Sequence, residues 1–182
     1  MARPSARPRL LDAALTVVEE RGITALTLDA VAEEAGVTKR GLIYHFPSKH
    51  ALILGLHEEL AARLEVLLLK ETGKAPEGAS LLERTRGYVK ATLSEPGNVE
   101  LQLILDATNE PEWLAPWNRI YHRWFPEEEL PVEELDDISV RCLVARMAAD
   151  GYWGYETIVT TPISREARSR IVGTILKSLE VE

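Results

Sequence analysis

Apolar residues near the N-terminus recur at helical spacing. Leu11, Ala14, Leu15 and Val18 stand at positions i, i+3, i+4 and i+7, and Gly22 follows them. This spacing places the apolar side chains on one face of an amphipathic helix, and glycine is typical of the position just after a helix. We therefore predict a first helix that ends at Gly22.

Two shorter helical patterns follow, and a glycine separates them. Thr27 is typical of an N-cap, and Gly36 suits the end of the same helix because glycine readily takes a left-handed backbone conformation. Thr38 is typical of the cap of the next helix, which runs to about Tyr44. Two short helices joined by a tight turn with glycine form a helix-turn-helix. The side chains predicted to face inward are Leu28, Val31, Ala32, Ala35, Val37, Leu42 and Phe46.

The rest of the chain also shows helical patterns, with no strand-like alternation. A leucine stripe predicts one long helix over residues 48–71, and Pro111 and Pro116 limit a later one. Further helices are predicted over residues 79–94, 98–108, 132–159 and 164–180. The fold class is therefore all-α, with about nine helices. We expect a three-helix N-terminal head, residues 1–47, joined by the long helix to a helical body, residues 48–182.

Composition leaves this picture unchanged, whereas the distribution of charge adds to it. Hydrophobic residues make up 46% of the chain and charged residues 27%, as in ordinary globular proteins, and no apolar run approaches a membrane span of ~20 residues. The net charge is -8, but residues 1–49 carry seven basic and six acidic side chains, whereas residues 50–182 carry 14 and 23. Local charge decides contact with DNA more than total charge does. The single cysteine, Cys142, excludes an internal disulfide and favours a cytoplasmic protein.

Polar donors gather on and just after the second helix of the helix-turn-helix. In such motifs this helix enters the major groove with its N-terminal residues at base edges. Gly41 lets the backbone approach DNA closely, and Arg40 either contacts a guanine edge or a phosphate, two interpretations that stay open. The predicted DNA-binding residues are Thr27, Thr38, Lys39, Arg40, Gly41, Tyr44, His45 and Lys49.

The segment ITALTLDAVAEEAGVTKRGLIYHFPSKHALI resembles the DNA-binding segment of the TetR family of one-component transcriptional regulators. The match spans roughly residues 8–55 in order, spacing and aromatic identity. Ile43 replaces a frequent tyrosine, and His50 stands where an acidic residue is common. The resemblance implies that the long helix links a DNA-binding head to a ligand-binding body and that the last two helices form a dimer interface.

Apolar residues at 3–4-residue spacing mark the surface expected to hold the dimer together. The predicted interface residues are Ile138, Cys142, Ala145, Ala149, Trp153, Ile171, Ile175 and Leu179. A two-fold dimer places two heads on successive major grooves, which predicts a pseudo-palindromic duplex as its operator. Arg146 and Asp150 are four residues apart, and we expect them to form a solvated ion pair in preference to the alternative, a contact with a ligand.

Aromatic residues in the body offer a candidate site for a small-molecule effector. Trp113, Trp117, Tyr121 and Trp124 are spaced by 4, 4 and 3, so they share one face of an unbroken helix. Such a face lines a ligand pocket or packs in the core, and both interpretations stay open. The candidate pocket residues are Leu101, Leu105, Trp113, Trp117, Tyr121, Met147 and Tyr152. Because these side chains are apolar or aromatic, we predict an apolar or aromatic effector.

No pattern predicts catalysis, a metal site or a cofactor. The four histidines lack metal-ligand spacing, and the HEEL segment that begins at His57 departs from H-E-x-x-H because Ala61 takes the last position. Cys142 is interpreted as a core residue. We therefore predict a TetR-like repressor, not an enzyme, that binds its operator as a dimer and is released by its effector. The alternatives are a ligand-responsive activator or an all-helical binding or scaffold protein without a DNA function.

Overall fold

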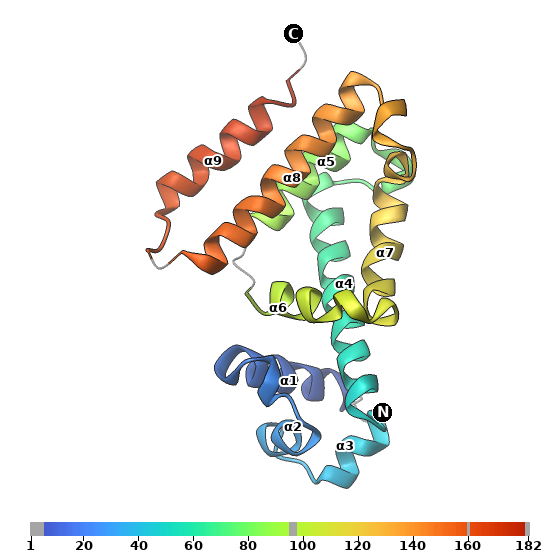
Figure 1. The fold of residues 1–182 in the computed structure, drawn as a ribbon, viewed down its shortest axis with the longest axis vertical. Helices are drawn as coiled ribbons and strands as arrows, with labels where there is room; N and C mark the ends of the chain where they lie inside the picture. Colours follow the sequence, from blue (N-terminus) through green and yellow to red (C-terminus); the bar gives the residue numbers. More distant parts are fainter. Residues whose placement is uncertain (1–5, 95–97, 160, 181–182) are drawn as a thin grey trace. The chain divides into compact units, whose positions relative to one another are not determined.

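A computed structural model describes residues 6–94, 98–159 and 161–180 of the chain (Figure 1). In these residues the regular structure consists of nine α-helices and short 3-10 turns, without a strand, which confirms the all-α prediction. The helices are α1 (Arg7–Arg21), α2 (Leu28–Glu34), α3 (Lys39–His45), α4 (Lys49–Thr72), α5 (Leu81–Thr92), α6 (Asn98–Asp106), α7 (Pro111–Trp124), α8 (Asp137–Ile158) and α9 (Arg165–Lys177).

The chain divides into two compact units. The first consists of Met1–Ala62 and Asn98–Trp117, and the second of Arg63–Gly97 and Asn118–Glu182. Helices α4 and α7 contribute residues to both units. The predicted domain boundary after residue 47 falls between α3 and α4, within the first unit, and stays a prediction.

Threonine hydroxyls begin both helices of the helix-turn-helix. Thr27 Oγ1 accepts a hydrogen bond from the backbone N–H of Ala30 at 3.1 Å, and Thr38 Oγ1 accepts one from Gly41 N–H at 3.1 Å. Each bond satisfies an N–H group that has no partner inside its own helix. Both predicted caps are therefore confirmed, and they fix where α2 and α3 begin.

The turn between α2 and α3 depends on Gly36. Its φ of 64° lies in the left-handed region, where a residue without Cβ meets no steric penalty. Gly36 N–H donates to the carbonyl oxygen of Glu33 at 3.0 Å, and Val37 N–H donates to that of Ala32 at 2.9 Å. These two bonds form a Schellman motif, so the predicted role of Gly36 at the end of α2 is confirmed.

Helix α3 is anchored from beneath by Leu42 and Phe46, which are both buried. Val37 was predicted to join them, but it belongs to the turn before α3 and is 37% exposed, so that prediction is wrong. At Gly55 of α4, an added Cβ would lie 2.7 Å from Phe46 Cε1 and 3.4 Å from Leu11 Cδ2. The absence of a side chain at Gly55 therefore lets α4 pack closely against the ring beneath α3 and against α1.

The second unit is built around α5, α8 and α9, which pack against one another (Figure 1). The apolar side chains buried in this unit include Leu68, Val89, Ala91, Trp124, Phe125, Cys142, Ala145, Ala149, Ile175 and Leu179. At Gly87 of α5, an added Cβ would lie 2.0 Å from Thr72 Oγ1, at the C-terminal end of α4. Glycine is therefore required there for α5 to approach α4.

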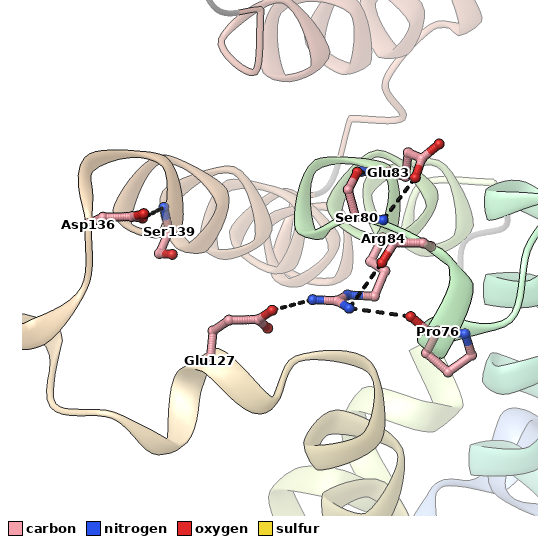
Figure 2. A network of polar contacts seen from close by, with 8 residues as sticks. Pro76, Ser80, Glu83, Arg84, Glu127, Asp136 and Ser139 are labelled. Atoms are coloured by element: carbon pink, nitrogen blue, oxygen red, sulfur yellow. Dashed lines mark hydrogen bonds and ion pairs between the residues drawn. The ribbon is translucent and has the colours of Figure 1, made fainter.

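Polar contacts fix the connections on either side of this core (Figure 2). The guanidinium of buried Arg84 donates to the carbonyl oxygens of Pro76 at 3.3 Å and Ala79 at 3.1 Å, and it pairs with Glu127. Asp136 caps α8 by accepting the N–H of Ser139 at 2.8 Å. The Arg84 contacts join the loop before α5 to the acidic segment before α8, which spans residues 126–136.

The acidic segment before α8 extends further toward the C-terminus than the sequence pattern predicted, because α8 begins later. A helix was expected from residue 132, but Val132–Glu134 forms a separate 3-10 turn and α8 begins at Asp137. Leu135 is extended, and the Asp136 cap starts the α-helix. The structure therefore corrects the predicted start by five residues, because the capping carboxylate sets it.

Helix α7 also departs from expectation, because it continues through Pro116. Pro111 occupies the first position, where a missing N–H costs no intrahelical bond. Pro116 gives up the hydrogen bond that its N–H would donate to the carbonyl group of Glu112, in the first turn. The expected limit at Pro116 is therefore wrong, and the aromatic residues of α7 lie on one continuous helix.

Candidate DNA-binding and effector sites

The outer surface of the helix-turn-helix carries the predicted DNA-binding residues. Tyr44 is 85% exposed, in contrast to the fully buried Leu42 on the opposite side of α3. His45 is half-buried, and its ring meets that of Tyr44 edge-on at 5.2 Å between centroids. The other predicted residues are exposed: Thr27, Thr38, Lys39, Arg40, Gly41 and Lys49. All eight lie in the first unit, and the contact with DNA itself stays a prediction.

One of these cations already has a partner within the head. Lys39 Nζ lies 2.8 Å from Asp29 Oδ2, which joins the start of α3 to the first turn of α2. Both side chains are more than half exposed, so the pair is worth only about 0–1 kcal/mol. If α3 docks on DNA, a phosphate oxygen takes the place of the Asp29 carboxylate beside Lys39, and the energy lost is that of this exposed ion pair.

His50, which departs from the family pattern, has its own partners in this chain. Its Nε2 lies 3.0 Å from Glu112 Oε2, and its ring centroid is 5.3 Å from that of Trp113. Both partners belong to the N-terminal turn of α7, within the first unit. The side chain that follows Lys49 therefore connects α4 to α7.

His57 of α4 is a polar residue for which the sequence predicted no role. It is fully buried, and its Nδ1 accepts a hydrogen bond from Trp117 Nε1 at 2.9 Å. An indole N–H can only donate, so Nδ1 carries no proton and the neutral ring carries it on Nε2. Burial lowers the pKa of His57 to about 4, and the charge of Asp106 opposes that change. His57 is therefore neutral at pH 7.

Two N–H donors lie beside this hydrogen bond. His57 Nε2 and Trp113 Nε1 are both buried without a hydrogen-bond partner among the described residues. The His57 and Trp113 rings stack, with centroids 6.2 Å apart and planes 18° apart. An unpaired buried donor costs about 1–3 kcal/mol, which a folded protein rarely leaves uncompensated. The burial of His57 was indicated in the sequence only by its position on the same helical face as apolar Ile53 and Ala61.

The candidate pocket residues are divided between the two units. Trp117 is buried and Leu101 and Trp113 are half-buried in the first unit, where Leu105 is 60% exposed. In the second unit Tyr152 is buried and Tyr121 is half-buried, whereas Met147 is 60% exposed. Leu105 and Met147 lie on the surface because they fall on the outer sides of α6 and α8, so the structure does not place them in a lining. A pocket formed by the remaining residues stays a prediction.

Aromatic rings in the second unit surround a cation of the chain itself. Arg146 is 5% exposed, and its guanidinium lies 3.7 Å from the ring centroid of Phe125 and 5.5 Å from that of Tyr88. Tyr88 donates to Asp150 Oδ1 at 2.6 Å and lies 3.0 Å from the hydroxyl of Tyr121, and burial raises the pKa of Tyr88. Arg146 is therefore a buried cation over aromatic rings, so the expectation that it is solvated is wrong. Arg146 and Asp150 still act on each other electrostatically.

The predicted dimer residues are mostly used inside one chain. Cys142, Ala145, Ala149, Ile175 and Leu179 are buried within the single chain, so their side chains are not available to a second one. These five side chains therefore have little exposed surface to offer a second chain, and the predicted interface itself stays a prediction. Trp153 and Ile171 are half-buried, and Ile138 is exposed.

A different side of α8 is exposed and apolar. The side chains that share this side are Val144, Met147, Tyr155 and Ile158, with Gly151 between them. The spacings of 3, 4, 4 and 3 residues place them on one helical stripe, as in helices that pack against a partner. We call these five residues the α8 stripe.

Two further features bear on other functions. Among the described residues, no helix combines the length and apolarity needed to cross a membrane. The same part of the chain contains no cluster of three or more His, Cys, Asp or Glu side chains placed to hold a metal ion. Cys142 is buried, and burial raises the pKa of its thiol.

The capped helix pair with exposed donors and a helical body defines the class of helix-turn-helix DNA-binding proteins. Residues 10–56 match the family described as bacterial regulatory proteins, tetR family, and residues 82–180 match the tetracyclin repressor-like C-terminal domain. The HTH-type transcriptional repressor KstR of Rhodococcus jostii is 37% identical over 158 residues, which cover 82% of this chain and 70% of KstR. The chain therefore belongs to the TetR family of transcriptional regulators.

Solved structures share the fold at lower identity. A transcriptional regulator from Rhodococcus sp. Rha1 aligns with a TM-score of 0.71 at 15% identity, over 96% of each chain. The multidrug binding protein EbrR in complex with ethidium aligns with a TM-score of 0.60 at 20% identity, over 96% of this chain and 99% of EbrR. At these identities the likeness shows the fold alone.

Proposed function

We propose that this regulator is a cytoplasmic repressor that acts by binding DNA and an effector and catalyses no reaction. It binds a pseudo-palindromic operator as a homodimer, and a small apolar or aromatic effector releases it. KstR, which is similar over most of the chain, is a repressor by name, and this supports repression over activation.

The observation that carries the proposal is the polarity of α3. Its inner residue Leu42 is fully buried, whereas Tyr44, Arg40 and Lys39 face outward and Lys49 follows at the start of α4. Hydroxyl, guanidinium and ammonium groups on one short helix match the donors that contact phosphates and base edges in a major groove. A scaffold protein would gain no stability from these exposed donors.

The α8 stripe supports the dimer. A monomer presents one α3 and contacts few base pairs, whereas a two-fold dimer presents two. Exposed Val144, Met147 and Ile158 gain free energy when a second copy covers them, because burial removes apolar surface from water. We therefore propose that the interface consists of this side of α8 and the half-buried Ile171 of α9.

The aromatic cluster of the first unit supports an uncharged effector. Trp113 and Trp117 surround neutral His57, and the nearby acidic Asp106 disfavours an anion. EbrR holds the aromatic compound ethidium, so a protein of this fold can bind a planar molecule. An effector releases DNA only if it binds the DNA-incompatible state better than the DNA-bound state.

The DNA part is tested by selecting duplexes from a random library with the purified protein. The selected sequences should contain two inverted half-sites. On that duplex, Lys39→Ala and Lys49→Ala should each lower the slope of log affinity against log salt by ~1. Lys70→Ala, which removes a lysine near the end of α4, is the matched control and should leave the slope unchanged. An unchanged slope in the Lys39→Ala, Lys49→Ala double variant would refute docking through α3.

The effector part is tested by release of the selected duplex. Fluorescence anisotropy of the labelled duplex is followed while apolar aromatic compounds and matched anionic compounds are added. Neutral aromatic compounds should lower the anisotropy saturably. Release by anionic compounds alone would contradict the proposed effector class.

A further inference from the structure

The aromatic cluster of the first unit contains two N–H donors for which the described part of the chain supplies no acceptor. His57 Nε2 and Trp113 Nε1 are buried without a hydrogen-bond partner among the described residues, and their rings stack with centroids 6.2 Å apart. His57 itself is 0% exposed. Buried polar groups in folded proteins are normally paired, so an unpaired one requires an explanation.

The hydrogen bond from Trp117 determines which atom of His57 is the donor. Because Trp117 Nε1–H donates to Nδ1 at 2.9 Å, the proton of the neutral imidazole lies on Nε2. Trp113 Nε1 always carries a proton. Both unpaired atoms are therefore N–H donors, and each needs an acceptor.

The surroundings restrict the kind of acceptor. Asp106 is close enough to His57 to act on it electrostatically, so an anion would be repelled. The faces of the tryptophan rings favour an apolar skeleton around the acceptor atom. A permanently bound water would accept from these donors but would direct its own hydrogens at ring faces, which satisfies it poorly.

We propose that His57 and Trp113 form an effector subsite that binds an uncharged oxygen acceptor, such as a ketone, ester or ether oxygen, carried on an apolar skeleton. The acceptor receives Nε2–H of His57, and Trp113 supplies a second donor. Trp113 is half-buried, so a rotation of its side chain opens the way to Nε2. This inference rests on the proposed function, because it specifies the chemistry of the effector.

The test compares two probes of the same shape, 1-indanone and indane, which differ by one carbonyl oxygen. Each is titrated into the uniformly ¹⁵N-labelled full-length protein without DNA, and side-chain N–H resonances of histidine and tryptophan are followed by NMR. The free protein should show His57 protonated on Nε2. Indanone should bind about tenfold more tightly than indane, as one added hydrogen bond allows, and should shift the His57 and Trp113 N–H resonances downfield.

Two variants and a matched control locate the selectivity. Trp113→Phe keeps a ring in place and removes its N–H, and His57→Phe removes the other donor. Each variant should reduce the preference for indanone while leaving the affinity for indane nearly unchanged. Trp124→Phe removes another buried indole N–H, which has no acceptor in the described ranges of the chain and belongs to the second unit. This variant should keep the full preference.

Equal affinity for the two probes, no binding of either, or shifts confined to other residues would overturn the subsite. The same holds if the His57 N–H exchanges magnetisation with a bound water that indanone does not displace. These results concern the DNA-free protein. Failure of the proposed function would appear separately, as an absence of operator binding or of its release by any neutral aromatic compound.

Discussion

The ammonium group of Lys39 lies 2.8 Å from the Asp29 carboxylate, so the first residue of α3 is paired with the first turn of α2. A negative charge at the N-terminus of α2 also favours that helix. On DNA, however, we expect the same carboxylate to repel phosphate and to compete for Lys39. Asp29 should therefore weaken DNA binding while it supports the fold of the head.

Removing this competition should strengthen DNA binding. We expect Asp29→Asn to raise affinity for the selected duplex by roughly two- to fivefold at low salt, the range that an exposed ion pair allows. Glu33→Gln removes an equal charge from the same helix and serves as the control. Fluorescence anisotropy at two salt concentrations measures the effect. An equal gain in both variants would show that general repulsion is relieved, with no special role for the pair.

Close packing at Gly55 should make the first unit sensitive to a single methyl group. Because an added Cβ would lie 2.7 Å from Phe46 Cε1, Gly55→Ala should lower the free energy of unfolding by about 1–3 kcal/mol. Gly173→Ala, in α9, meets no atom within 4 Å and should be neutral or stabilising. Thermal unfolding followed by circular dichroism compares them, and equal midpoints would contradict the packing argument.

The α8 stripe should hold the dimer together. Met147→Glu places a charge in a surface that a second copy would cover, so sedimentation should show a mass falling from about twice 20.3 kDa toward 20.3 kDa. Val66→Glu changes an equally exposed apolar residue of α4 and should leave the mass unchanged. A Met147→Glu protein that remains dimeric would place the interface elsewhere.

Local chemistry explains which parts of the fold could be predicted. Thr27, Thr38 and Gly36 act within a few residues of themselves, so their patterns give the helix-turn-helix directly. The start of α8 was missed because apolar and acidic residues before Asp136 do not show which carboxylate caps the helix. Predictions therefore held where one residue and its near neighbours decide the structure.

Contacts between distant residues explain what the sequence could not provide. Two sides of α8 are apolar, and the periodicity of the sequence does not tell which side packs against α5. In the structure Cys142 and Ala145 are buried, whereas Val144 and Met147 are exposed. His57 acquires its role from Trp117, 60 residues away. Its spacing to other histidines only excluded a metal site, and gave no sign of an indole partner.

The buried His57 should also make stability depend on pH. Its pKa is about 4 in the folded chain against 6.5 for an ordinary histidine, so between these values the unfolded chain binds more protons. Stability is therefore fully present above about pH 6.5 and declines as pH falls toward 4. At 1.36 kcal/mol per pKa unit, the difference of 2.5 corresponds to at most about 3 kcal/mol.

This part of the acid sensitivity should disappear with the side chain. Denaturant unfolding at pH 7.0 and pH 4.5 should show a smaller loss of stability in His57→Gln than in the unsubstituted protein. His122→Gln is the control, because exposed His122 pairs with Glu129 at the surface. Other acidic groups titrate equally in all three proteins, so the comparison isolates His57. If His57→Gln loses as much stability as the unsubstituted protein, the ring is not held neutral by burial, and the assignment of its Nε2 proton fails with it.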